Sequence, residues 1–272
     1  LKIQSVIVSL ALCNSMSPLG DKFNKDITEQ KMATFHLTIK SGKKGSAVDH
    51  SAYITRAGKH GQGEMAADLV ATGSGNLPSW ASEAKTFWRQ ADAHERKNGA
   101  VYREFEMALP NELNADQQKA LVGDFIRDVV GDKTFQFAIH RPEAAIGKVP
   151  QAHVHLMISD RVPDEIDRVP ERYFRRFNRA QPENGGCRKD SCGRDRHVLR
   201  NEVISCREKW AKLQNEHLEL NGHAARVDHR SHRERGLEAA PEHHLGPAKV
   251  RQMTDDERKA MRAQREDGSS TD

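Results

Sequence analysis

The chain has 272 residues, enough to bury a substantial core in one large domain or two small ones. Charged residues make up 30% of it, and 43 lysines and arginines stand against 39 aspartates and glutamates, so the placement of the basic excess matters more than its sum. Four cysteines are too few for a disulfide scaffold, which excludes a small disulfide-rich secreted protein and favours a reducing, cytoplasmic location.

The first 31 residues are predicted to be an N-terminal extension outside the fold. The apolar run at 5–13 is too short to span a membrane, and only Lys2 precedes it. We therefore expect neither a signal peptide nor membrane insertion. One domain is predicted over residues 32–235, followed by a charged C-terminal tail over 236–272.

Four segments alternate between apolar and polar residues with the period of two that is typical of a half-buried strand. They lie at 33–40, 102–109, 135–140 and 153–158. Each has one apolar and one polar face. This pattern predicts an α+β fold built on an antiparallel sheet, with helices packed on one side and a functional cleft on the other.

Four helices are predicted around these strands, at 47–59, 79–97, 114–130 and about 195–220. Asn114 is suited to cap the third helix. Leu121, Phe125 and Val129 follow it at intervals of four residues and form a core-facing stripe. The Asn-Gly pair at 221–222 is suited to end the fourth helix. The last 25 or so residues predict a charged helix that fades into a disordered tail.

The last predicted strand carries His153 and His155, which alternation places on one face. A single pair of this kind is a weak motif, and half-exposed polar side chains explain it well. The preceding strand ends at His140, and the prolines and glycine of the connecting loop predict a long hairpin. Antiparallel pairing then places His140 beside His153. Three converging imidazoles match a divalent metal site with positions open for substrate, with His36 as a reserve ligand.

A site of this kind is a Lewis acid for a carbonyl or a phosphoryl oxygen. Residues 172–200 carry nine basic and three acidic side chains, which suits a polyanion and favours phosphoryl, although a solvated charged loop explains them equally well. Chemistry at phosphorus needs a nucleophile. Tyr53 lies in a small-residue helix with Arg56, Lys59 and His60 close by, and taken alone it is explained by packing.

Two further groups of side chains are open to more than one interpretation. Cys187 and Cys192, with His197 nearby, have a spacing that zinc tolerates, but no second ligand pair follows, which disfavours a structural zinc. Glu104 and Glu106 are expected on the polar face of the sheet. One of them is placed to orient a ligand imidazole, and an exposed ion pair is an equal alternative.

Several unusual motifs follow one another between residues 32 and 248: HSAYITRAGK, REFEMALP, AIHRP, AHVHLMISDR, RRFNRAQPENGGCRKD and DHRSHRERGLEAAPEHHLGPA. In these motifs and their order the sequence resembles the MobA/MobL family of plasmid mobilization relaxases, which are His-hydrophobe-His endonucleases. The resemblance implies a relaxase-like fold with a C-terminal helical segment. It also implies Tyr53 as the nucleophile and His140, His153 and His155 as ligands of Mn²⁺ or Mg²⁺.

The function that the resemblance implies is the nicking of one DNA strand at a plasmid origin of transfer. The Tyr53 hydroxyl attacks a phosphodiester in line, a 3′-hydroxyl leaves and a 5′-phosphotyrosine remains for later rejoining. The DNA-binding residues are predicted to be Arg56, Arg172, Arg175, Arg176, Arg179 and Lys189. The implied partners are single-stranded DNA at the origin, accessory relaxosome proteins and a conjugative coupling protein.

Two alternatives stay open. A rolling-circle replication initiator or a transposase uses the same chemistry, but in those enzymes the tyrosine generally follows the histidines, whereas Tyr53 precedes them. A non-catalytic origin-binding regulator that keeps the fold is the second alternative. It would bind the origin equally well with Tyr53 replaced.

Overall fold

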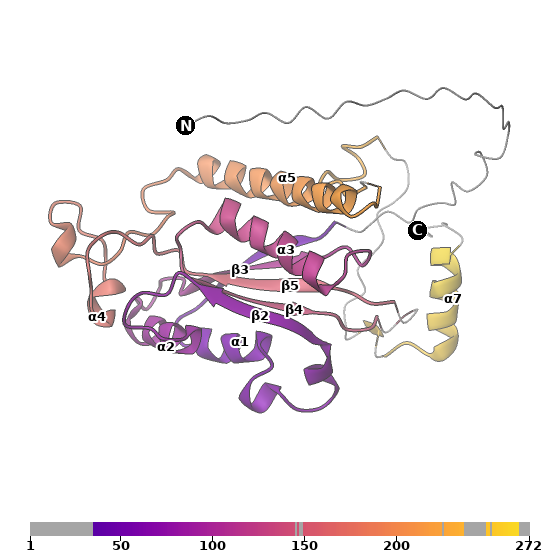
Figure 1. Cartoon of the computed structure of the whole chain (residues 1–272), viewed down its shortest axis with the longest axis horizontal. Helices are drawn as coiled ribbons and strands as arrows, with labels where there is room; N and C mark the ends of the chain where they lie inside the picture. The colour runs from indigo at the N-terminus through magenta and orange to yellow at the C-terminus, as the bar shows by residue number, and fades with distance from the viewer. Residues whose placement is uncertain are drawn as a thin grey trace, which may run out of the picture. The chain divides into compact units, whose positions relative to one another are not determined.

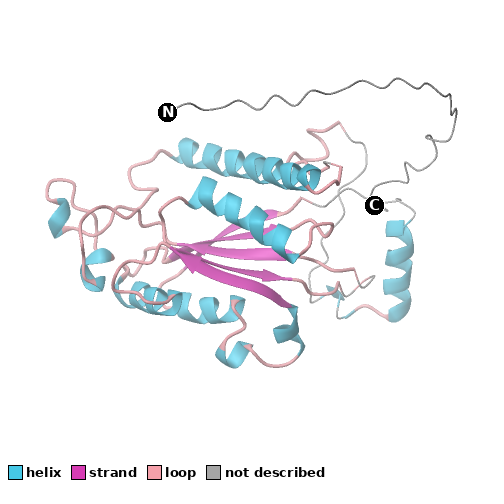
Figure 2. Cartoon of the chain, in the orientation of Figure 1, coloured by secondary structure: helices cyan, strands magenta, loops and turns pink. Residues whose placement is uncertain are grey.

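The computed structural model of the chain describes residues 35–144, 146, 149–224, 226–236, 249–250 and 252–266. The predicted extension at 1–31 and the last residues of the predicted tail, 267–272, lie outside them. Within the described residues, a five-stranded antiparallel sheet lies between two layers of helices, which confirms the predicted α+β class (Figures 1 and 2). No helix in this part of the chain is long and apolar enough to cross a lipid bilayer.

The strands are β1 (Leu37–Gly42), β2 (Leu69–Gly75), β3 (Tyr102–Ala108), β4 (Phe135–His140) and β5 (His153–Ile158). They are ordered β1-β3-β5-β4-β2, and each neighbouring pair is antiparallel. The α-helices are α1 (Ala47–Ile54), α2 (Ala84–His94), α3 (Ala115–Phe125), α4 (Pro170–Tyr173), α5 (Arg196–Leu220) and α7 (Asp255–Glu266). A π-helical turn, Ile126–Val130, continues α3, and short 3₁₀ turns lie at Gly58–His60, Glu64–Asp68 and Pro182–Asn184.

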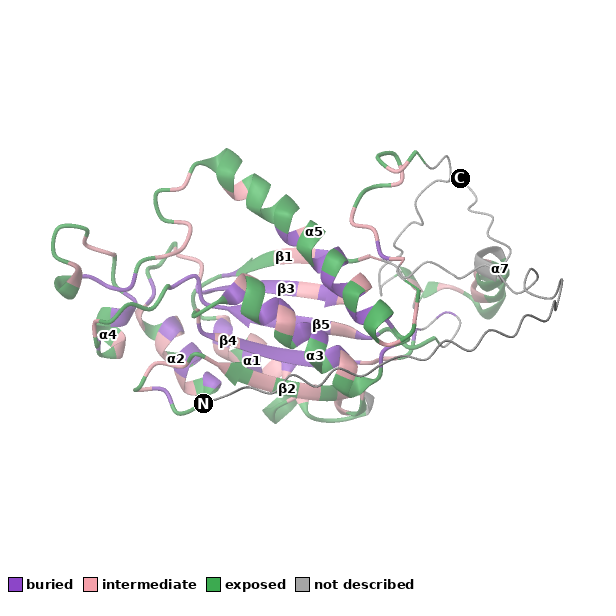
Figure 3. Ribbon diagram, turned by 45° about the horizontal axis from the view of Figure 1, so that its top comes forward, coloured by how far each residue is buried: buried purple, intermediate pink, exposed green. Residues whose placement is uncertain are grey.

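One face of the sheet packs against α3 and α5 (Figures 1 and 3). The alternating apolar residues of the strands meet the buried side of both helices, with Phe125 of α3 packed edge-on against Phe105 and Trp210. Asn114 caps α3 through a capping box, as predicted. The long C-terminal helix also begins and ends close to its predicted bounds, because Asp195 caps it and the Asn-Gly pair ends it.

The other face was expected to carry no helices and to form a functional cleft, and the first part of that expectation is wrong. The helices α1 and α2 cover it, and a second buried cluster that includes Phe87, Trp88 and Met157 fills the space. The polar strand residues serve this packing. The Gln136 side-chain oxygen accepts hydrogen bonds from the Ser51 hydroxyl at 2.8 Å and the Trp88 indole at 2.7 Å.

The edge strand β2 was not predicted, because the two glycines and the serine that end its sequence, LVATGSG, are typical of a turn. The glycines have a packing reason. A Cβ atom on Gly73 would lie 2.6 Å from the Phe137 ring, and one on Gly75 would lie 2.6 Å from the Phe135 ring. The Phe137 and Phe135 rings therefore lie over the two positions of β2 that lack a side chain. The same pairing brings Leu69 opposite His140.

The tertiary structure also sets the position of α1. Its first turn has no side-chain cap of its own, and the Asp92 carboxylate of α2 accepts from the backbone amides of Gly45, Ala47 and Val48. The helix ends at Ile54, earlier than predicted, because Arg56 adopts a left-handed backbone conformation, with φ of 53°. The end of α1 consequently lies against the end of β4.

Candidate active site

Three histidines converge where β4 and β5 meet at one end of the sheet. His140 is directly opposite His153 in the β4–β5 register, as the hairpin predicted, and His155 follows on the same face. Their ring centroids are 5.1 to 5.4 Å apart, and one ligand-type nitrogen from each lies within 4.8 Å of the others. Among the described residues this is the one group of three or more His, Cys, Asp or Glu arranged to hold a metal ion.

Hydrogen bonds through Nδ1 orient two of the rings and leave the lone pair of each Nε2 available to a metal ion. Nδ1 of His153 donates to the Gln151 carbonyl at 2.9 Å, and Nδ1 of His155 donates to the Glu104 carboxylate at 2.8 Å. The protons are assigned from these partners, because carbonyl and carboxylate oxygens can only accept. Burial lowers the pKa of His153, which favours the neutral, ligating form.

His140 differs from the other two in its partners. Its Nε2 donates to the Ile54 carbonyl at 2.6 Å, which leaves Nδ1 as the lone-pair atom, and Nδ1 lies 3.3 Å from a guanidinium nitrogen of Arg56. The ring is fully buried. Burial lowers the pKa of His140 to about 4 against the opposing effect of the Ile54 hydrogen bond, and the charge of Arg56 acts with burial. The imidazole is therefore neutral.

The structure distinguishes the two candidate carboxylates. Glu104 is buried and bridges His155 and His50, with both contacts at 2.8 Å. Burial opposes its ionisation, but the hydrogen bonds from both histidines outweigh burial and lower the pKa of Glu104 to about 2. It has the position expected of a residue that orients a metal ligand. Glu106 instead forms an ion pair with Lys40 at 2.5 Å.

Other candidate ligands lie apart from this site. His36 hydrogen-bonds to the Thr38 hydroxyl at 3.1 Å and precedes β1, which is separated from β5 by β3. Cys187 is buried and Cys192 is exposed, and with His197 they form no metal-type group among the residues that the structure describes. The zinc site that was considered for these side chains, and disfavoured, is therefore not formed there.

Tyr53 lies in the last turn of α1, one residue before the Ile54 carbonyl that holds His140. Its ring is partly exposed, lies 6.0 Å from the ring of His50 and 5.5 Å from that of His60, and has the Arg56 guanidinium 5.0 Å from its centroid. The other two tyrosines of the chain, Tyr102 and Tyr173, are buried. Tyr53 is thus the one tyrosine that is partly exposed.

Arg172, Arg175, Arg176 and Arg179 are exposed on the long loop that follows β5 and includes the short helix α4, in which Arg172 lies. This loop leaves the sheet at the end opposite the histidines, which is about 17 Å away along β5 at roughly 3.3 Å per residue. The structure therefore does not bring these arginines to the three-histidine site. Any DNA that contacts both regions has to cross the sheet end to end.

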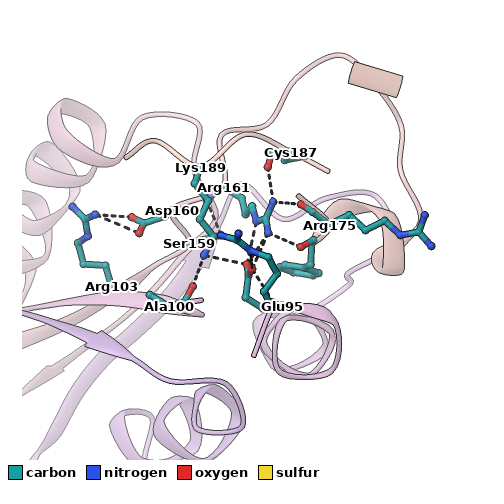
Figure 4. Close-up of polar contacts among 11 residues, drawn as sticks. Glu95, Ala100, Arg103, Ser159, Asp160, Arg161, Arg175, Cys187 and Lys189 are labelled. Carbon is teal, nitrogen blue, oxygen red and sulfur yellow. Dashed lines mark hydrogen bonds and ion pairs between the residues drawn. The ribbon is translucent and has the colours of Figure 1, made fainter. Parts of the chain in front are cut away.

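Charged side chains anchor this loop from the inside (Figure 4), and two of them, Arg161 and Glu95, were not singled out in the sequence. Arg161 pairs with Glu95 at 2.8 Å and donates to the carbonyls of Phe174, Arg175 and Cys187. Lys189, which was predicted to contact DNA, has its ammonium 3.2 Å from Glu95 and 2.5 Å from the Ala100 carbonyl. It points inward and holds the loop.

Two more residues at the site were not predicted. His50 is three residues before Tyr53 in the same helix, a spacing that places both on one side of α1 and was readable in the sequence. Asp68 had no such signal. It lies just before β2, and its carboxylate pairs with Arg56 at 3.0 Å.

The protein is an α+β protein with a candidate divalent-metal centre. The centre consists of three imidazoles that face one point, with a carboxylate behind one of them and a tyrosine on the adjoining helix. Residues 46–255 match the sequence model of the MobA/MobL family, and the chain belongs to this family. The 43 kDa relaxation protein of Salmonella typhimurium is 44% identical over 209 residues, which cover 76% of this chain and 56% of the relative.

Mobilization protein A of Escherichia coli is 40% identical over 221 residues, which cover 79% of this chain and 30% of the relative. The chain thus spans about half or less of the length of these two relatives. A structure solved in work on the molecular basis of vancomycin resistance transfer in Staphylococcus aureus has a TM-score of 0.53 and 22% identity, over 73% of this chain and 100% of that one. That likeness supports the fold alone.

Proposed function

We propose that the chain is a relaxase, which nicks one DNA strand at a plasmid origin of transfer, remains attached through a 5′-phosphotyrosine and later rejoins the strand. The observation that carries the proposal is the convergence of His140, His153 and His155 beside the end of α1 that bears Tyr53. The names of the relatives, a relaxation protein and a mobilization protein, support it.

The three histidines fit a divalent cation, because burial favours the neutral imidazole at His140 and His153, and because the Nε2 atoms of His153 and His155 have no role in orienting the rings. His140 would contribute Nδ1, the nitrogen that also faces Arg56. A bound Mn²⁺ or Mg²⁺ would polarise the phosphoryl oxygens and neutralise their charge as a Lewis acid. Glu104 would keep the His155 ring at a fixed angle toward that ion.

Tyr53 supplies the nucleophile in this mechanism. Its hydroxyl oxygen forms a bond to phosphorus as the bond from phosphorus to the 3′-oxygen breaks, the phenolic proton passes to a base or to water, and the departing 3′-oxygen takes up a proton. One phosphodiester replaces another. The step is therefore reversible, which separates strand transfer from hydrolysis.

Binding of the DNA strand is assigned to the exposed arginines of the loop after β5, namely Arg172, Arg175, Arg176 and Arg179. Their distance from the histidines means that they would hold phosphates several nucleotides from the cleaved bond. Accessory relaxosome proteins and a conjugative coupling protein are the further partners that we propose, with the cytoplasm, where plasmid DNA is processed, as the location.

The test is to incubate the protein with labelled single-stranded origin DNA and Mn²⁺ or Mg²⁺, and to search for a protein–DNA adduct that survives denaturation. We expect the adduct with the parent and none with Tyr53→Phe. Equal binding without any adduct would favour a non-catalytic origin-binding regulator. An adduct that persists in Tyr53→Phe would point to another tyrosine and against this mechanism.

A further inference from the structure

Arg56 joins the tyrosine to the histidine cluster. Its side chain is only 6% exposed, and its guanidinium makes four kinds of contact. Nε and Nη2 donate to the two oxygens of Asp68 at 3.1 and 3.0 Å, Nη1 donates to the Tyr53 carbonyl at 3.0 Å, and Nη2 lies 3.3 Å from His140 Nδ1. Its central carbon lies 5.0 Å from the centroid of the Tyr53 ring.

The backbone at Arg56 is also unusual. A φ of 53° is in the left-handed region, which residues with a side chain rarely adopt. This conformation turns the chain back after α1 and aims the guanidinium at the sheet. An uncommon backbone conformation, combined with a buried side chain whose three nitrogens all have partners, is typical of a residue whose position matters for function.

Asp68 is held independently of Arg56. It directly precedes β2, and its carbonyl accepts from the Arg141 amide at 2.7 Å, so the β2–β4 pairing fixes it beside His140. The Asp68 carboxylate balances the buried guanidinium. Without this anion, a positive charge would lie next to the nitrogen that has to bind a cation.

We propose that Arg56 and Asp68 form a charge-neutral positioning pair, in which Arg56 holds Tyr53 and His140 in a common orientation and Asp68 cancels its charge at the cation site. The sequence suggested a DNA-contacting role for Arg56, whereas its burial and its contacts assign it to the interior of the site. This inference rests on the proposed function for its effect on cleavage. Its effect on metal affinity does not depend on cleavage.

The charge-neutral pair predicts that removing the cation and removing the anion affect Mn²⁺ affinity differently. Arg56→Gln removes a cation and a competitor for the Nδ1 lone pair, so Mn²⁺ affinity should stay the same or rise. Asp68→Asn leaves the guanidinium unbalanced, so Mn²⁺ affinity should fall roughly tenfold. Both variants should slow single-turnover cleavage at saturating Mn²⁺ by about 10- to 100-fold, because Tyr53 loses its anchor.

Arg56→Lys separates charge from geometry. It retains the positive charge but cannot bind both Asp68 oxygens and the Tyr53 carbonyl at once, so Mn²⁺ affinity should match the parent while cleavage is as slow as in Arg56→Gln. Arg103→Gln is the matched control. It removes an arginine from another ion pair, Arg103 with Asp160 at 3.1 Å, at the opposite end of the sheet, and it should change neither quantity.

The measurements are Mn²⁺ titration by calorimetry, single-stranded DNA affinity at several salt concentrations, and cleavage rates for the full chain. Support consists of an Mn²⁺ affinity that falls in Asp68→Asn and does not fall in Arg56→Gln, with DNA affinity within about twofold of the parent in both. A loss of DNA affinity and of salt dependence in Arg56→Gln would overturn the proposal and make Arg56 a phosphate contact. A parallel loss of Mn²⁺ affinity in Arg56→Gln and Asp68→Asn would overturn it in favour of a structural role. If the parent forms no adduct, the relaxase proposal fails and the two Mn²⁺ titrations still decide this one.

Discussion

Replacing Glu104 by glutamine removes the charge that accepts hydrogen bonds from His155 and His50. The pKa of this carboxyl is about 2, against 4.5 for the unperturbed group. At about 1.4 kcal/mol per pH unit, the difference corresponds to about 3 kcal/mol of stability. Because the folded-state pKa is lowered, this contribution is fully present above pH 4.5 and is lost as the pH falls toward 2.

We therefore expect Glu104→Gln to lower the free energy of unfolding at pH 7 by up to about 3 kcal/mol, and to lose most of this difference from the parent at pH 3. Mn²⁺ affinity should fall about 10- to 100-fold, because an amide holds the His155 ring less firmly than a carboxylate. Urea unfolding with a chelator present, at pH 7, 4.5 and 3, measures the first effect, and calorimetry measures the second.

Glu106→Gln is the matched control for this experiment. It removes a neighbouring carboxylate of the same strand, whose partner Lys40 is 55% exposed, so its cost should stay below about 1 kcal/mol. Equal destabilisation by both variants would refute the reasoning. So would a difference between parent and Glu104→Gln that persists unchanged from pH 7 to pH 3.

Three further predictions concern the ligands, the nucleophile and the DNA-binding loop. His153→Ala should abolish cleavage and weaken Mn²⁺ binding with little loss of stability, whereas His140→Ala should also unfold more easily, because it leaves a cavity in a fully buried site. Mn²⁺ calorimetry measures the first effect and thermal unfolding the second. Unchanged Mn²⁺ affinity in both variants would contradict the proposed metal centre. Tyr53→Phe removes one oxygen, so Mn²⁺ and DNA affinities should match the parent while the adduct and the rejoining of cut strands disappear; slow cutting that leaves a free 5′-phosphate is compatible with this, and a persisting adduct is not. Neutralising Arg175, Arg176 and Arg179 together should flatten the salt dependence of single-stranded DNA binding by about 0.7 in log K per decade of salt for each phosphate that these arginines bind in the parent; a slope equal to that of the parent would place the DNA elsewhere.

Local patterns in the sequence determined much of the sheet and of the site. Strand alternation and a turn-rich loop were enough to pair His140 with His153, because an antiparallel hairpin leaves little freedom in register once one face is apolar. The cap at Asn114 and the bounds of α5 follow from hydrogen bonds between near neighbours. These features depend on residues that are close in sequence, or on one periodicity.

The tertiary structure alone decided which polar residues face the interior. Gln136 was expected to line a cleft, but its partners Ser51 and Trp88 lie 85 and 48 residues away along the chain. Arg161 and Glu95, which anchor the loop of exposed arginines, are 66 residues apart. No local pattern records such pairs, since a buried charge is tolerated only when a distant segment folds back to neutralise it. The same holds for β2, whose glycines are explained only by the Phe135 and Phe137 rings that lie over them.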